Sequence, residues 1–264
     1  MSTARPGTHI VAITSGKGGV GKSFVAANLA AALVLDGHRV LVMDADLGLA
    51  NLDIILDLKP TATLHEVLMG SRRLDEVILQ APGGFSVLPA GSGFADYSKL
   101  NDDLRRRLRG VFDELGGRYD YLLLDTGAGI ADVVLYVASL ADEIVVVATP
   151  EPTAMADAYA MIKVLAMQQQ RSQVHLVINQ VRRQGEGLTL TRQLQQVVDR
   201  FIDAGTPGGS VRLGFLGEIP HDELVPQAVR SRRLLLESSP GSAVGRSLID
   251  IAGRLARRLF AAAA

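Results

Sequence analysis

Residues 16–23 combine glycines, lysines and a serine in the spacing Gly-x-x-x-x-Gly-Lys-Ser. Glycines at these positions let backbone N–H groups converge on an anion, and a helix that begins directly afterwards adds the positive end of its dipole. The last lysine would reach the β- and γ-phosphates of a nucleoside triphosphate, and the serine hydroxyl would face Mg²⁺. We therefore predict nucleotide contacts at Gly18, Gly19, Val20, Gly21, Lys22, Ser23 and Phe24, with Ser23 as a magnesium ligand.

The same stretch also matches Gly-x-Gly-x-x-Gly, starting at Gly16, which is typical of NAD-binding folds. Three features favour a triphosphate instead. A lysine and a serine directly follow the last glycine, a second lysine, Lys17, lies within the loop, and an aspartate, Asp125, ends a later apolar run. A thermal-shift comparison of ATP with NAD would separate the two ligands.

Acidic residues follow two apolar runs of the strand type. Asp44 ends residues 39–44, Asp46 comes two residues later, and Asp125 ends residues 121–125. Because the carboxyl ends of parallel strands meet at one edge of a sheet, we expect these carboxylates beside the phosphate loop. Asp125 is predicted to hold Mg²⁺ or its waters. The glycine-rich turn at residues 126–129 would leave a backbone N–H near the γ-phosphate, as a switch that senses hydrolysis.

The strand-type runs alternate with helical runs along the whole chain. Residues 9–14, 23–35 and 39–44 form a β-α-β unit, which implies a right-handed crossover and a parallel sheet. We predict a single α/β P-loop NTPase domain over residues 1–264, with a doubly wound, mostly parallel sheet, helices on both faces and a short tail at 1–8. Further strands are expected at residues 85–89, 121–125, 143–149, 174–178 and 211–219, and helices at 63–69, 74–79, 100–115, 153–167, 188–202, 224–232 and 242–260.

Composition excludes several classes of protein. With 48% hydrophobic and 21% charged residues, the chain is typical of a globular protein. Its net charge of −1 provides no general attraction to nucleic acid, so we expect no nucleic-acid partner and interpret the arginines within residues 100–115 as a solvated helix face. The absence of cysteine excludes cysteine-ligated iron–sulfur carriers. Because no apolar run of about 18 residues and no leader-like pattern occurs, we expect a cytoplasmic protein.

The C-terminal segment, residues 246–264, is predicted to be a basic amphipathic helix. Leu248, Ile251 and Leu255 share one helix face, and Arg246 and Arg254 lie largely elsewhere. Such a helix can lie on an anionic membrane, which would place the protein peripherally at the inner face of the cell membrane. It can equally close the fold by packing on the sheet. We favour packing, because no other predicted element covers that side of the sheet.

Several segments resemble a known family of ATPases. The run from Lys17 to Ser23 resembles the deviant Walker A motif of the MinD/ParA ATPases, in which the early lysine is the family's signature. Residues 44–53, 83–89 and 151–159 look most like the branch that regulates flagellar number and placement, FlhG/FleN. The resemblance extends from about residue 10 to the C-terminal helix, and it implies the fold predicted above, with ATP and Mg²⁺ as ligands.

The resemblance implies an ATPase that works as a nucleotide-gated homodimer. Lys17 would cross the interface to the partner's phosphates in place of an arginine finger, while Lys22 would act within its own chain. Asp46 would position the attacking water, and Asp44 would lie near the magnesium shell. By the same resemblance, Glu151 lies where such dimers meet across the nucleotide, and Asn179, Pro220, His221 and Asp222 lie where the family recognises adenine.

The resemblance also indicates a biological role. It favours regulation of flagellar number and placement by slow ATP hydrolysis that a partner stimulates. The expected partners are flagellar regulatory or assembly proteins, such as a GTPase or a transcriptional activator. Cell-division positioning of the MinD type and DNA partitioning of the ParA type are the alternatives within the family. A scaffold that binds ATP without hydrolysing it is the alternative outside enzymes. One departure from the family pattern is Gly127, where relatives often have proline or alanine.

Overall fold

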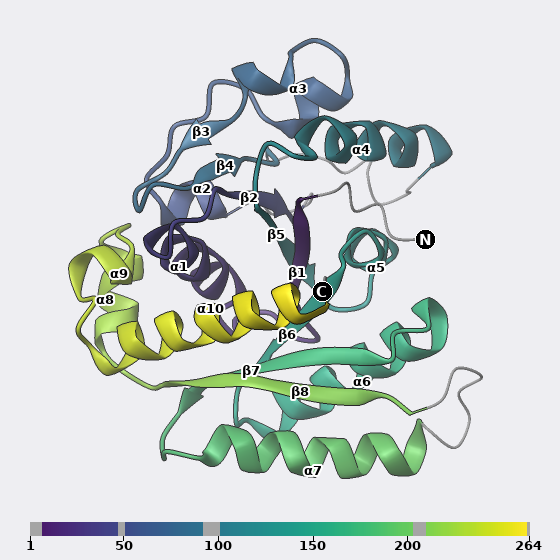
Figure 1. Cartoon of the computed structure of the whole chain (residues 1–264), viewed down its shortest axis with the longest axis vertical. Helices are drawn as coiled ribbons and strands as arrows, with labels where there is room; N and C mark the ends of the chain where they lie inside the picture. Colours follow the sequence, from purple (N-terminus) through teal and green to yellow (C-terminus); the bar gives the residue numbers. More distant parts are fainter. Residues whose placement is uncertain (1–6, 47–50, 92–100, 203–209, 263–264) are drawn as a thin grey trace.

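The computed structural model describes residues 7–46, 51–91, 101–202 and 210–262, the last five of these as backbone only. An eight-stranded sheet has the order β3-β4-β2-β5-β1-β6-β7-β8 (Figure 1). Every strand pair is parallel except β3 with β4, so the predicted mostly parallel, doubly wound sheet is confirmed. The strands are β1 (His9–Ser15), β2 (Val40–Ala45), β3 (Leu79–Gln80), β4 (Ser86–Leu88), β5 (Tyr121–Ala128), β6 (Glu143–Ala148), β7 (Gln173–Val181) and β8 (Arg212–Pro220).

Helices cover both faces of this sheet, as predicted. Consecutive residues of β1 point to opposite faces, so that Ile10 and Ala12 join one hydrophobic core while Val11 and Ile13 join the other. The first core lies under α4, α5, α6 and α7, and the second under α1, α9 and α10 (Figure 1). The helices are α1 (Lys22–Leu35), α2 (Leu52–Ile55), α3 (Leu64–Leu68), the 3₁₀ helix η1 (Leu74–Glu76), α4 (Asp102–Leu115), α5 (Asp132–Ser139), α6 (Pro152–Gln169), α7 (Glu186–Phe201), α8 (Leu224–Arg230), α9 (Leu235–Ser238) and α10 (Ala243–Ala262).

The structure differs from the expected elements at several short segments. The predicted helix at residues 74–79 is wrong, because it consists of the single turn η1 followed by β3, which pairs antiparallel with β4. Helices α2, α5 and α9 were not predicted. Their apolar residues are held by tertiary packing rather than by a long amphipathic pattern, as with Val134 and Val137 of α5, which are buried in the first core. The sequence also predicts a turn at residues 91–93 and a loop at residues 205–210, and both lie mostly outside the described residues.

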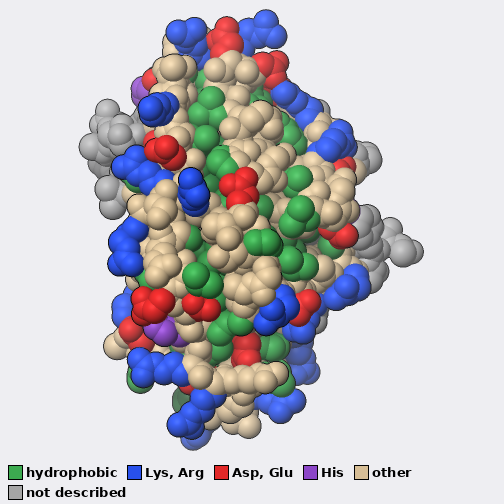
Figure 2. Space-filling view, turned by 90° about the vertical axis from the view of Figure 1, so that its left-hand side faces the viewer, with side chains coloured by type: hydrophobic (Ala, Val, Ile, Leu, Met, Phe, Trp, Pro, Cys, Tyr) green, Lys and Arg blue, Asp and Glu red, His purple; other side chains and the backbone are tan. Residues whose placement is uncertain are grey.

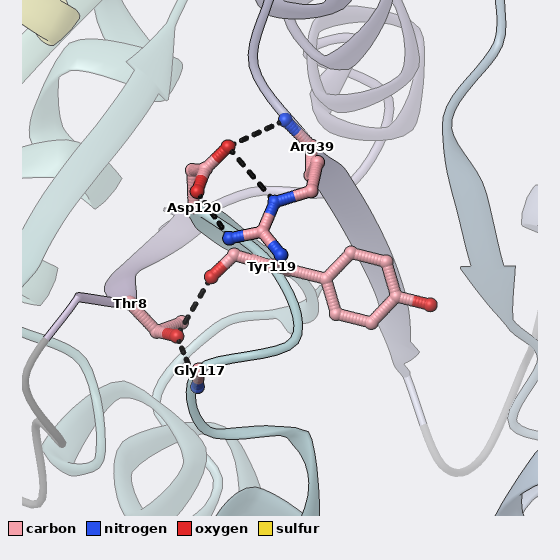
Figure 3. Close-up of polar contacts among 5 residues, drawn as sticks. All are labelled: Thr8, Arg39, Gly117, Tyr119 and Asp120. Carbon is pink, nitrogen blue, oxygen red and sulfur yellow. Dashed lines mark hydrogen bonds and ion pairs between the residues drawn. The ribbon is translucent and has the colours of Figure 1, made fainter.

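Strands β1, β2 and β5 are tied together at their amino ends (Figure 3). Arg39, just before β2, forms an ion pair with Asp120, just before β5, with 2.7 Å between Nη2 and Oδ1. The same guanidinium holds the pKa of the Asp120 carboxyl below its usual range. Before β1, the Thr8 hydroxyl donates to the Tyr119 carbonyl and accepts from the Gly117 N–H, at 2.7 and 2.8 Å. These contacts set the register of the three strands whose carboxyl ends carry the predicted site.

The apolar face of α10 is buried in the second core. Leu248, Ile251 and Leu255 are buried against α1 and β8, beside which α10 lies in Figure 1. Arg254 donates from Nη1 to the Leu216 carbonyl of β8 at 3.1 Å, so even one of the basic residues faces the sheet. As far as Arg257, the last residue whose side chain is described, α10 therefore packs on the fold. Among the described residues, none of the helices is both long and apolar enough to cross a membrane.

Candidate functional site

The phosphate loop connects β1 to α1 at the centre of the sheet. Because β1 lies between β5 and β6, and the chain winds away from it in both directions, its carboxyl end is a topological switch point, where α/β proteins bind ligands. Gly19 and Gly21 have φ angles of 79° and 95°, in the left-handed region that favours glycine. Gly21 is the N-cap of α1. Its conformation turns the chain directly into the helix, whose N-terminal N–H groups face the loop.

Two other glycines of the loop differ in what surrounds them. A Cβ on Gly16 would overlap the backbone carbonyl of Asp157 in α6, whereas a Cβ on Gly18 would meet no atom within 4 Å. Gly16 therefore serves close packing of the loop on α6, and Gly18 borders free space in which a phosphate could lie. Val20 and Phe24, predicted to contact nucleotide, have buried side chains in the second core, so only their backbone groups can face a ligand.

Asn179, near the end of β7, is hydrogen-bonded to the phosphate loop. Its side-chain amide donates to the Val20 carbonyl at 2.8 Å, its Oδ1 accepts from the Gln180 N–H at 2.9 Å, and the side chain is buried. A Cβ on Gly21 would collide with the same amide nitrogen. Asn179 is thus seated against the loop, and the adenine contact predicted for it stays a prediction.

Lys22, Ser23 and two carboxylates meet beside the loop. Burial lowers the pKa of Lys22, and the opposing charges of Asp125 and Asp46 act to raise it, which places both acids near the ammonium group. The Ser23 side chain lies beside the Asp125 carboxylate, where it acts to lower the pKa of that group. Burial raises the pKa of Asp125 to about 6, and its Oδ1 is buried without a hydrogen-bond partner in the described part of the chain. An orphaned buried carboxylate oxygen beside a serine hydroxyl fits a magnesium ion or its water ligand.

Asp44 is buried next to Asp125 on the neighbouring strand, where the two residues are register partners. Its carboxylate accepts from the backbone N–H groups of Asp46, Asn51 and Leu52, at 3.1, 3.1 and 3.2 Å. Burial and the nearby charge of Asp125 raise the pKa of Asp44 to about 7. Both oxygens therefore anchor the chain on either side of residues 47–50, and a place in the magnesium shell stays a prediction for this residue.

No three acidic or histidine side chains among the described residues form a ready-made metal cluster. Mg²⁺ commonly takes one or two protein ligands and completes its octahedron with phosphates and water. Ser23 and Asp125 are the side chains that fit this role best.

The glycine-rich turn after Asp125 is partly tied down. Gly129 donates its N–H to the Ser15 carbonyl at 2.9 Å, so this N–H is occupied and cannot be the one predicted to face a γ-phosphate. The Thr126 hydroxyl lies within 3.2 Å of the Ile13 carbonyl and 3.0 Å of the Gly127 carbonyl. The turn is therefore seated directly on the end of β1, where it can respond to what the loop binds.

Lys17 points to the first turn of α6 in its own chain. Its Nζ lies 2.9 Å from Glu151 Oε2 and 3.0 Å from Thr153 Oγ1. The lysine and glutamate side chains are 39% and 65% exposed, so the pair contributes at most about 1 kcal/mol, which a phosphate could replace. Thr153 was not predicted, although its place two residues after Glu151 brings it to the same helix start.

The residues predicted to recognise adenine end up together. Asn179 and Ile219 are register partners on β7 and β8, and Pro220 ends β8. The His221 N–H donates to the Val181 carbonyl at 2.8 Å, and the Asp222 carboxylate accepts from the Leu224 N–H at 2.9 Å, where α8 begins. The His221 side chain is exposed. The structure thus brings the end of β7 and residues 220–222 to one place, and adenine binding by these residues stays a prediction.

The face at which the strands end is shown in Figure 2, which views the left-hand side of Figure 1. Hydrophobic side chains gather along its middle, and Lys and Arg lie mainly along its two sides. Exposed apolar residues that follow strand ends are Ile54 on α2, Ile130 after β5 and Val229 on α8, with 52%, 50% and 38% of their surface exposed. The distribution resembles a protein interface, in which an apolar centre is surrounded by a polar rim.

Comparisons with known proteins agree with this geometry. Residues 11–235 match the family described as the CobQ/CobB/MinD/ParA nucleotide binding domain. The chain is 39% identical to the antiactivator FleN of Pseudomonas aeruginosa, over 92% of this chain and 84% of FleN. It is 36% identical to the flagellum site-determining protein YlxH of Helicobacter pylori, over 96% of this chain and 83% of YlxH.

A solved structure supports the same assignment. The septum site-determining protein MinD of Pyrococcus horikoshii, complexed with Mg-ADP, superposes with a TM-score of 0.76 at 26% identity, covering 94% of this chain and 96% of that protein. The resemblance predicted from the Lys17 motif is therefore confirmed. The chain belongs to the MinD/ParA family of nucleotide-binding proteins.

Proposed function

We propose that the protein is a Mg²⁺-dependent ATPase that dimerises with ATP and regulates the number and placement of flagella. The observation that carries the biochemical part is the meeting of Lys22, Ser23 and the orphaned Asp125 oxygen beside a glycine loop at the switch point of the sheet. The flagellar part rests on the identity with FleN and YlxH, whose names state an antiactivator and a flagellum site-determining protein.

Each residue has a role in this proposal. Backbone N–H groups from Gly18 to Phe24 bind the phosphates, with Lys22 neutralising the β- and γ-phosphates. Ser23 and Asp125 would hold Mg²⁺, which supplies positive charge against the phosphate oxygens. Asp46 orients a water molecule whose oxygen attacks the γ-phosphorus, while the bond from that phosphorus to the β–γ bridging oxygen breaks and ADP leaves with the electron pair.

The dimer would complete the site. Lys17 follows the end of β1 and contacts Glu151 and Thr153, which follow the end of β6, so a second copy docked at the carboxyl end of the sheet could receive this lysine on its own phosphates. Phosphate would replace Glu151 as the partner of the ammonium group, at little cost because that pair is exposed. A lysine supplied in trans provides the charge that an arginine finger provides elsewhere.

The test measures mass and turnover together. Purified protein should change from monomer to dimer in light scattering when ATP and Mg²⁺ are added, and should release phosphate. Lys22→Ala should abolish both changes, whereas the matched control Lys163→Ala, on an exposed position of α6, should behave as the unaltered chain. Dimerisation of Lys22→Ala on adding ATP would overturn the biochemical proposal.

The flagellar role needs a separate test in cells. Replacing the gene by the Lys22→Ala form should change the number or position of flagella, counted by electron microscopy, and leave division-site placement and chromosome segregation unaltered. Misplaced septa with normal flagella would favour the cell-division role instead. A segregation role would require DNA binding that falls steeply with salt.

A further inference from the structure

Gly127 lies against the carboxylate of Asp46. The two residues follow the register pair of Ala45 in β2 and Thr126 in β5, so they are neighbours across the sheet. A Cβ built on Gly127 would lie 3.3 Å from Asp46 Oδ1 and 3.4 Å from Asp46 Cγ. It would also lie 3.4 Å from Cγ2 of Val134. The carboxylate is thus as close to this glycine as packing permits, and a single methyl group would press on it.

The surroundings determine which group would give way. Val134 of α5 is buried in the first core, and the backbone around Gly127 is held by the Thr126 hydroxyl and by the hydrogen bond from the Gly129 N–H to the Ser15 carbonyl. The φ angle of Gly127 is not positive, so alanine fits the backbone itself. Asp46, by contrast, is half-buried, and its carboxylate is the end of a rotatable side chain, which can turn by a few tenths of an ångström while the backbone N–H stays bonded to Asp44. The Asp46 carboxylate is therefore the group that moves.

We propose that Gly127 is a positioning residue for hydrolysis: by lacking a side chain, it gives the Asp46 carboxylate the place from which that group orients the attacking water. The inference rests on the proposed function, in which Asp46 acts on water. A displacement of about 1 Å in a reacting group can lower a rate by about 100-fold. A methyl group that shifts the carboxylate by a few tenths of an ångström should therefore slow hydrolysis by about 3- to 10-fold.

The first experiment separates turnover from binding. Gly127→Ala should lower kcat by about 3- to 10-fold while the Kd for a fluorescent ATP analogue, the ATP-induced dimer mass and the Tm stay nearly unchanged. The matched control is Gly110→Ala on α4, where a Cβ would meet no atom within 4 Å and the backbone is helical. It should leave kcat, the Kd and the dimer mass unaltered and raise the Tm by about 1–2 °C, because alanine is favoured over glycine inside an exposed helix. Rates are normalised to the fraction of protein that binds the analogue, so partial unfolding cannot imitate a loss of kcat.

The second experiment asks whether Gly127 acts through Asp46. Single-turnover hydrolysis is measured for Asp46→Ala and for the double variant with Gly127→Ala. If the glycine positions the carboxylate, alanine at 127 should change the residual rate by less than about 1.5-fold once the carboxylate is gone. An equal loss in both backgrounds, or no loss of kcat in Gly127→Ala alone, would overturn the inference. If Asp46→Ala hydrolyses ATP at the unaltered rate, it is the proposed role of Asp46 that fails.

Discussion

Gly16 allows the packing of the phosphate loop to be tested with one methyl group. In Gly16→Ala, the added Cβ would overlap the Asp157 carbonyl oxygen and lie 2.8 Å from the Asp157 Cβ. Two carbon atoms pack best at about 3.5–4.0 Å, so even the second contact is about 1 Å too short. The obstructing oxygen belongs to the helix backbone of α6 and cannot rotate away. We expect the substitution to lower the free energy of unfolding by about 3 kcal/mol, the upper range for an overpacked site.

The assay is thermal unfolding of the nucleotide-free protein, followed by circular dichroism. At about 2.1 cal/mol/K per residue, a chain of 264 residues has an unfolding entropy of about 0.55 kcal/mol/K, so 3 kcal/mol corresponds to a fall in Tm of about 5 °C. The control is Gly18→Ala, two residues away, whose Cβ meets nothing within 4 Å. That variant should keep its Tm within about 1 °C and instead bind ATP more weakly. Equal Tm values for the two variants would refute the packing argument.

Three further outcomes follow from other parts of the structure. Asn179→Ala removes the donor to the buried Val20 carbonyl, so urea unfolding should show a loss of about 1–2 kcal/mol; an unchanged midpoint would count against that role. In the folded protein the pKa values of Asp44 and Asp125 are raised to about 7 and about 6, from an ordinary value of 3.8. The folded state therefore binds more protons than the unfolded chain from about pH 4 to about pH 8. The free energy of unfolding of the nucleotide-free protein should therefore fall as pH rises from about 5 to about 8, and a rise would contradict the assignment. Leu255→Ala in α10 should cost about 2–5 kcal/mol because its side chain is buried, while the exposed Arg257→Ala should stay within about 0.5 kcal/mol, both measured by urea unfolding; equal effects would speak against the packed helix.

Much of the fold could be predicted because its signals are local. The long apolar runs that became β1, β2 and β5 are buried on both sides, which is what a parallel sheet requires, and helix α1 begins at the glycine that caps it. Short elements escaped prediction where only distant packing stabilises them. The two residues of β3 form a strand because they pair with β4, and the sequence of residues 74–80 contains no signal that predicts this pairing.

In the candidate site, too, features with a local sequence pattern could be predicted, and features that depend on distant packing could not. That Lys22, Ser23 and Asp125 lie close together could be predicted from spacing, because a phosphate loop and a strand-end aspartate have strong sequence patterns. The packing of Gly16 on Asp157 could not, since it depends on how closely α6 approaches the loop. Likewise, spacing shows Asp44 as an acid at a strand end, whereas only the structure shows three backbone N–H groups bonded to its carboxylate.

Mixing two variants tests most directly whether Lys17 completes the site of a second copy. Lys17→Ala and Asp46→Ala, each expected to hydrolyse ATP poorly alone, are combined in equal amounts with ATP and Mg²⁺, and formation of mixed dimers is verified with two affinity tags. If Lys17 acts in trans and Asp46 in cis, each mixed dimer has one complete site, and random pairing should restore about a quarter of the unaltered rate of phosphate release. If mixed dimers form and the rate stays at the level of the separate variants, Lys17 does not act across the interface.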